Sequence, residues 1–158
     1  MANPEKLREV FVYRGYKDRV FKTKVEQELR KVIPGQITIK WLYEVHRPEL
    51  IEQKIKQLEQ LTHQERQAQL HIIHISAFMD DAKINPYIEQ LTKLSQLTHV
   101  VFWSGEMFVW DDPRITIARK LQEQNLPLAI TQPTYGNWTE DIANLVKAVK
   151  SLFNHPLE

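Results

Sequence analysis

Short runs of apolar residues alternate five times along the chain with segments whose apolar residues recur every three or four positions. The first run is Val10–Tyr13, and Phe21, Val25, Leu29 and Val32 follow it at helical spacing. Runs rich in β-branched and aromatic residues are typical of strands, whereas the longer spacing places one apolar stripe on a helix. The pattern therefore predicts five consecutive strand–helix units.

The four later strands differ in how their apolar residues are arranged. They are expected at residues 37–43, 70–76, 99–103 and 126–131. In the second strand Ile37, Ile39, Trp41 and Tyr43 alternate with other residues and share one face, which favours a place at the edge of a sheet. The third strand is almost continuously apolar, as expected of a central strand covered on both faces.

Prolines mark the expected starts of three helices. Pro48 is expected in the first turn of the second helix. Asn85–Pro86 and Asp112–Pro113 each supply a capping side chain followed by a residue whose fixed φ suits the first helical position. The polar stretch 62–69 either extends the second helix or forms a loop.

This order of elements predicts an α/β fold. Five strand–helix units in a row favour a parallel sheet with helices on both faces, and right-handed crossovers leave few strand orders. We expect a three-layer, flavodoxin-like domain with a five-stranded parallel sheet in the order 2-1-3-4-5. Residues 1–158 are expected to form this single domain, with Leu157 and Glu158 typical of vector-derived residues.

Composition excludes several classes of function. The 158 residues contain no cysteine, which excludes disulfides, thiolate metal sites and cysteine nucleophiles. The net charge of +1 provides no basic field for nucleic acid, and no apolar run reaches the ~20 residues that span a bilayer. The four glycines are too scattered for a dinucleotide fingerprint or a P-loop. We therefore expect a cytoplasmic protein without a nucleic-acid or membrane partner.

Aromatic, basic and acidic residues follow the predicted strands. In parallel sheets, ligands bind at the carboxyl ends of the strands, near the point where the strand order reverses. The mixture suits a polar ligand with an aromatic part or a protein surface. The candidate ligand-binding residues are Tyr13, Arg14, Gly15, Asp18, Arg19, Ser76, Trp103 and Ser104. The two arginines either hold a phosphate or carboxylate or pair with nearby acids.

Two histidines resemble a metal-binding pair. His71 and His74 are three positions apart on a predicted strand, so their side chains are expected on opposite faces and not on one metal ion. Asp80 and Asp81 either contribute to a divalent cation site or are solvated, and no further ligand can be placed beside them. We predict no metal site.

The stretch after the fourth strand holds two further candidates. Glu106 either is a solvated loop acid or acts as a general base or binds a ribose. The apolar stretch 107–110, which includes Phe108 and Trp110, must pack on a helix, cover a pocket or face a partner.

Two segments resemble the TIR domain, a flavodoxin-like signalling module. Residues 10–15, with Asp18 and Arg19, look like the opening strand and the arginine–glycine–acid loop of that family. Residues 100–103, followed by 112–114, are similar to its fourth strand and the acidic, proline-containing loop beyond it. The serine usual in the first strand and the tryptophan usual in the third helix are missing here.

The resemblance implies a function in signalling through a protein partner or self-association. Phe108, Trp110 and Arg114 are then the interface residues. In family members that cleave NAD, a glutamate of the third helix is catalytic, and Glu89 lies near that position, with Glu106 as the alternative. The resemblance therefore also leaves open an enzyme that cleaves NAD or another nucleotide, or a domain that only binds a nucleotide.

A receiver-like domain of two-component signalling is the rival resemblance. Residues 130–133 resemble the lysine–proline corner of that family, with Gln132 in place of the lysine. Arg14 and Gly15 stand where its acidic pair belongs, so only a non-phosphorylatable receiver would fit.

Overall fold

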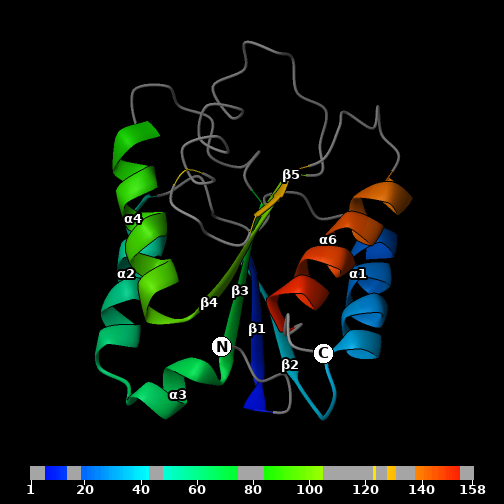
Figure 1. Ribbon diagram of the computed structural model, residues 1–158, viewed down its shortest axis with the longest axis horizontal. Helices are drawn as coiled ribbons and strands as arrows, with labels where there is room; N and C mark the ends of the chain where they lie inside the picture. Colours follow the sequence, from blue (N-terminus) through cyan, green and yellow to red (C-terminus); the bar gives the residue numbers. More distant parts are fainter. Residues whose placement is uncertain are drawn as a thin grey trace.

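A parallel β-sheet between helices forms the centre of the molecule (Figure 1). The computed structural model describes residues 6–13, 19–42, 48–74, 84–104, 123, 128–130 and 138–153. The strands are β1 (Glu9–Tyr13), β2 (Thr38–Leu42), β3 (Gln69–His74), β4 (His99–Ser104) and β5 (Leu128–Ile130). The helices are α1 (Arg19–Val32), α2 (Pro48–Glu59), α3 (His63–Gln67), α4 (Ile84–Leu97) and α6 (Trp138–Phe153).

The strands lie side by side in an order that differs from their order in the sequence. β1 pairs with β2 on one side and with β3 on the other, so that Phe11 lies opposite both Lys40 and His71. β4 follows β3, and the three-residue β5 pairs with β4. All of these pairs are parallel, which confirms the predicted α/β class with a parallel sheet.

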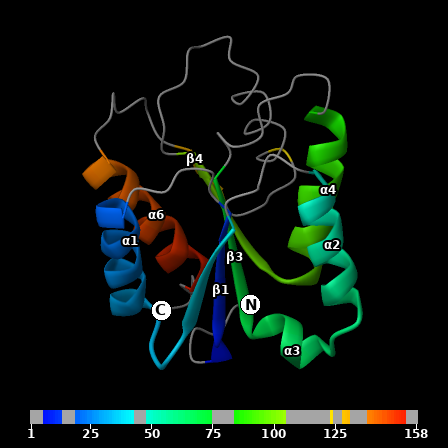
Figure 2. The same ribbon diagram turned by 180° about the vertical axis from the view of Figure 1, so that it is seen from behind.

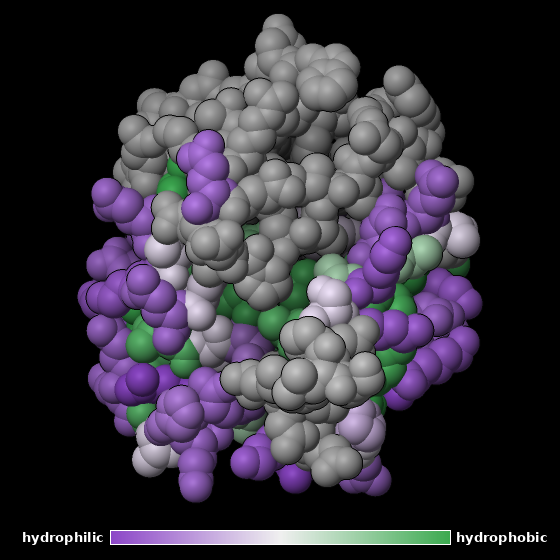
Figure 3. Space-filling model, viewed as in Figure 1, coloured by the Kyte–Doolittle hydropathy of each residue, from purple (hydrophilic) through white to green (hydrophobic). Residues whose placement is uncertain are grey.

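The helices form one layer on each side of this sheet. α2 and α4 pack together on one face, whereas α1 and α6 pack on the other (Figures 1 and 2). Successive residues of a strand point to opposite faces, so Phe11 and Tyr13 join the first cluster of buried side chains and Val10 and Val12 the second. On the face that Figure 3 shows, the described residues on the outer sides of the helices are mostly hydrophilic.

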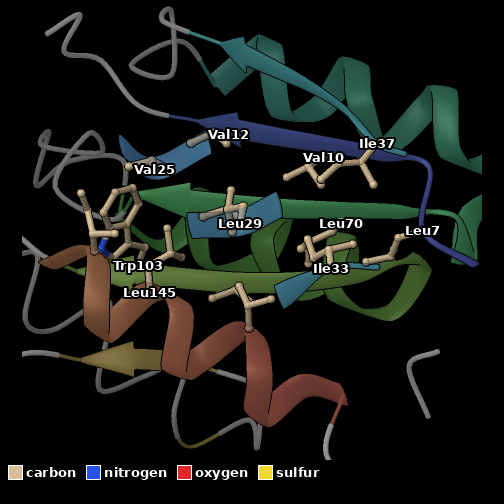
Figure 4. Close-up of a cluster of buried hydrophobic side chains, with 14 of the residues drawn as sticks. Leu7, Val10, Val12, Val25, Leu29, Ile33, Ile37, Leu70, Trp103 and Leu145 are labelled. Atoms are coloured by element: carbon tan, nitrogen blue, oxygen red, sulfur yellow. The ribbon is translucent and has the colours of Figure 1, made fainter. Parts of the chain in front are cut away.

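The apolar residues that the sequence pattern places on one face of an element are the residues that form the core. Phe21, Val25 and Leu29 of α1 are buried, and Figure 4 shows Val25 and Leu29 against the sheet. On β3 every residue from Leu70 to His74 is buried, which confirms its central place. Among the described strands β2 pairs only with β1, and its residues are exposed or half-buried, which confirms the edge position of the second strand.

Two predicted helix boundaries have different outcomes. α2 begins at Pro48 as expected. α4 begins at Ile84, so Asn85 and Pro86 lie within its first turn, and the prediction of a cap at Asn85 is wrong. The first four backbone N–H groups of a helix have no partner in the helix, so a proline is tolerated in the first turn beyond its first position. The helix expected after Asp112 lies outside the described residues.

The stretch 62–69 contains a short helix of its own instead of an extension of α2 or a plain loop. Thr62 caps α3: the Glu65 N–H donates to Thr62 Oγ1 at 3.1 Å, and the Thr62 N–H donates to Glu65 Oε1 at 3.0 Å. The backbone N–H of Thr62, and then its side chain, hydrogen bond to the Glu65 carboxyl group and lower its pKa. Arg66 Nε donates to the carbonyl oxygen of Leu58 at 2.8 Å and so connects α3 to the end of α2.

Replacing Thr62 by alanine is expected to destabilise the protein by about 1 kcal/mol, because the first turn of α3 loses its capping oxygen. Thr62→Ser keeps that oxygen and is expected to unfold close to the wild-type midpoint. Urea denaturation followed by circular dichroism measures both. Equal losses for the two variants would show that the methyl group of Thr62, and not its hydroxyl, stabilises this turn.

Candidate functional site

The path of the chain changes direction between two neighbouring strands. From β1 the chain continues to α1 on one face of the sheet, and from β3 it continues to α4 on the opposite face. β1 and β3 are adjacent and parallel, so their carboxyl ends lie side by side at this reversal. In open α/β sheets this is the position at which ligands bind. The geometry therefore places the candidate site at the carboxyl ends of β1, β3 and β4.

An aromatic cluster lies under this edge on the α1 and α6 side. Trp103, at the end of β4, is completely buried. Its ring stacks on Phe21 of α1, with centroids 5.7 Å apart, and meets the His74 ring edge-on at 5.0 Å. Its Nε1–H donates to the backbone oxygen of Asp141 in α6 at 3.1 Å. Trp103, labelled in Figure 4, thus connects the ends of β3 and β4 to the starts of α1 and α6.

A hydrogen-bonded pair lies on the opposite face of the sheet. The hydroxyl of Tyr13, at the end of β1, is 2.6 Å from Nδ1 of His71 in β3. Nε2 of His71 lies 2.8 Å from Gln69 Oε1, which only accepts hydrogen bonds. Nε2 therefore carries the proton, and Nδ1 accepts the hydrogen of the tyrosine. The His71 ring also stacks on Phe11, with centroids 4.8 Å apart.

Burial keeps both members of this pair uncharged. It raises the pKa of the Tyr13 phenol far above its ordinary value. Burial, and then the positive charge of Lys54, lowers the pKa of His71 to about 3. Lys54 Nζ lies 4.8 Å from the centroid of the Phe11 ring, and its own pKa is lowered by burial and then by Lys40. A neutral tyrosine–histidine pair thus holds the end of β1 against β3.

Tyr13 and Trp103 occupy the strand ends at which they were expected, but their side chains belong to the core. Both are completely buried, and the polar atom of each is hydrogen bonded to a neighbouring element. A central strand covered on both faces has no exposed face, so its last side chains pack inward. Their assignment as ligand-binding residues stays a prediction, and in the described structure they position the edge of the sheet.

The remaining predicted residues are distributed as follows. Arg19 is the exposed first residue of α1, and Ser104 is the last residue of β4. Glu89 is exposed on α4, on the side of the sheet opposite Trp103, so the structure does not bring these two together. The others lie outside the described residues: Arg14, Gly15, Asp18, Ser76, Glu106, Phe108, Trp110 and Arg114.

The two histidines of β3 face opposite sides of the sheet, as expected. His71 lies with Phe11 and Tyr13, whereas His74 lies against Trp103. Over the ranges that the structure describes, no three histidine or carboxylate side chains gather as a metal site would require.

Sequence reasoning missed the roles of two residues at the site. Lys54 lies on α2 and is far in the sequence from the end of any strand. Asp141 is a buried carboxylate in the first turn of α6. An acid in the first turn of a helix is the only sequence signal that pointed to Asp141. Nothing in the pattern around Lys54 pointed to the sheet.

Comparisons with protein-family models, with curated proteins and with solved structures found no match. Among the described helices, none combines the length and the apolar character needed to cross a membrane. The functional argument therefore rests on the topology of the sheet and on the residues that follow its strands.

Proposed function

We propose that the chain is a flavodoxin-like, three-layer domain of the TIR-like kind that acts as a signalling module through protein contacts. The parallel strands in the order β2-β1-β3-β4-β5 and the two helical layers support this proposal. The contact surface is the carboxyl edge of the sheet.

The observation that carries the proposal is the reversal between β1 and β3. Arg14 follows β1 in the sequence, and residues 105–114 follow β4, so the arginines and aromatics of the family resemblance all follow strands that end at this edge. A cluster of aromatic and arginine side chains is typical of the centre of a protein interface.

The described side chains favour a protein partner over a nucleotide. Tyr13 and Trp103 are buried, so neither offers an aromatic face for a base to stack on. The sequence also has no glycine-rich loop to surround a phosphate. Phe108 and Trp110 then supply the apolar contact area at the edge, and Arg14 and Arg114 its polar contacts.

The experiment compares Arg14→Ala, Trp110→Ala and Arg114→Ala with the wild type in multi-angle light scattering and in pull-downs with the protein as its own bait. Each variant is expected to weaken self-association or partner capture. Lys56→Ala is the matched control, because it removes a charge from an exposed side chain of α2 that pairs with Glu52 at 3.7 Å. Unchanged association in all three variants, with the fold intact by circular dichroism, would refute the interface.

Incubation with NAD followed by chromatography separates this module from an enzyme. We expect no release of nicotinamide and no thermal stabilisation by nucleotides. Glu89→Gln and Glu106→Gln are the matched variants. If the wild type releases nicotinamide and one of these variants does not, the chain is a nucleotide-cleaving enzyme and not a signalling module. The residue changed in that variant would then be the catalytic carboxylate.

A further inference from the structure

A lysine interrupts an apolar row of α2. Lys54 lies four residues after Leu50 and four residues before Leu58, and residues at this spacing share one side of a helix. Leu58 is buried, and Leu50 packs against the same core cluster on this face of the sheet. Lys54 is half-buried in this row. Its position therefore brings the ε-amine toward the sheet instead of into bulk solvent.

Two lysines face one aromatic ring at this place. Lys54 Nζ lies 4.8 Å from the centroid of the Phe11 ring, and Lys40 Nζ, from β2, lies 5.5 Å from the same centroid. Phe11 is almost completely buried, so its ring keeps water away from one side of each ammonium group. Two like charges so placed repel each other, and the loss of a proton from either amine removes this repulsion.

The charges of the sheet do not neutralise Lys54. Glu9 of β1 lies 3.1 Å from Lys40, and His71 of β3 is an uncharged ring. Within the described ranges, no residue forms a hydrogen bond or an ion pair with Lys54. Burial and then Lys40 lower the pKa of Lys54, and Glu9 opposes them less strongly. A larger share of this amine is therefore in the neutral form, which is the nucleophile.

Other charged residues of α2 form pairs of their own. Lys56 lies 3.7 Å from Glu52, and Glu59 lies 3.4 Å from Lys93 of the neighbouring helix α4. A carboxylate beside an amine favours the protonated form of that amine. The side chain of Lys56 is 68% exposed, whereas Lys54 is half-buried. Lys56 is therefore a reference on the same helix that differs from Lys54 in both partner and exposure.

We propose that Lys54 is a site of covalent acylation, at which its ε-amine takes a short acyl group from an acyl phosphate or a thioester. The nitrogen lone pair attacks the acyl carbon, so an N–C bond forms and the C–O bond to phosphate or the C–S bond to sulfur breaks. Phosphate or thiolate leaves with the bonding electrons, and the nitrogen gives one proton to water. The amide is uncharged, so its formation ends the repulsion between Lys54 and Lys40.

Acetylation of the full chain, followed by tandem mass spectrometry of its fragments, tests the proposal. With acetyl phosphate at pH 7.5, Lys54 is expected to react at least about threefold faster than Lys56, because its environment disfavours the ammonium form. The ratio is expected to fall at pH 10.5, where about half of ordinary lysine amines are neutral. Exposure alone predicts the reverse order, so faster acetylation of Lys56 at pH 7.5 would overturn the proposal.

Two variants and a second acyl donor show whether the local charges cause this preference. Lys40→Gln removes the like charge and leaves Glu9 to interact with Lys54, so acetylation of Lys54 at pH 7.5 is expected to slow about threefold. Lys31→Gln makes the same change on α1, where Lys31 pairs with Glu28 at 3.1 Å, and is expected to leave the rate unchanged.

The second donor, S-acetyl-N-acetylcysteamine, is an uncharged thioester and is expected to show the same preference for Lys54. A preference seen only with acetyl phosphate would assign it to binding of the phosphate and would overturn the proposal. An unchanged rate in Lys40→Gln, with the fold intact by circular dichroism, would do the same.

Discussion

Replacing Trp103 by alanine is expected to destabilise the protein by about 3–5 kcal/mol, the cost typical of removing a large buried aromatic side chain. Trp103 is completely buried, and its ring contacts Phe21 and His74. Its Nε1–H is bonded to the backbone oxygen of Asp141. Replacement by alanine would therefore leave a cavity and would remove the contacts through which Trp103 joins β4 to β3, α1 and α6.

Chemical denaturation of three variants measures this effect and separates its parts. Trp103→Phe keeps a ring for Phe21 to stack on but loses the donor to Asp141, so its expected loss is about 1–3 kcal/mol. Val20→Ala is the control, because Val20 lies on α1 with 66% of its surface exposed. Its effect is expected to stay within about 0.5 kcal/mol. A Trp103→Ala loss as small as that of the control would mean that α6 is not held through this residue.

Acidification is expected to destabilise the protein below neutral pH through His71. The pKa of this histidine is about 3 in the folded protein and 6.5 ordinarily. Between these values the unfolded chain binds a proton that the folded chain does not bind. Stability is therefore complete above pH 6.5 and falls as the pH falls toward 3, with a limiting slope of about 1.4 kcal/mol per pH unit. His99, whose pKa burial also lowers, acts in the same direction.

Urea denaturation between pH 7 and pH 5 measures this slope in a range above the ordinary pKa of the carboxylates. The double variant Tyr13→Phe/His71→Phe removes both members of the buried pair, and only the half-buried Gln69 loses a hydrogen bond, so a shallower slope is expected. His63→Gln replaces an exposed histidine of α3 and serves as the control. The assignment to His71 is wrong if the double variant keeps the wild-type slope.

The parallel sheet was predictable because buried and exposed strands differ in the pattern of apolar residues along their sequences. β3 is apolar throughout and lies in the centre, whereas β2 alternates and lies at the edge. The apolar stripe of α1 likewise identified the face that packs on the sheet. These patterns depend on solvent exposure alone, which the position of an element in the sheet determines.

The chemistry at the strand ends was less predictable, because it depends on which elements meet. Tyr13 and Trp103 were expected to contact a ligand, yet both pack inward. The neutral state of His71 depends on Lys54, which α2 brings to the sheet from a distant part of the chain. The capping box at Thr62 was missed because the stretch is polar and too short for an apolar period.

The bond between Tyr13 and His71 also has a consequence for folding kinetics. The two residues are 58 positions apart in the sequence, so β1 meets β3 only after a long loop has closed. Contacts of such high sequence separation slow folding, and those absent from the transition state act mainly on the unfolding rate. If this buried bond forms only after the transition state, it acts mainly on how long a folded molecule persists, and the unfolding rate of the Tyr13→Phe/His71→Phe variant measures that effect.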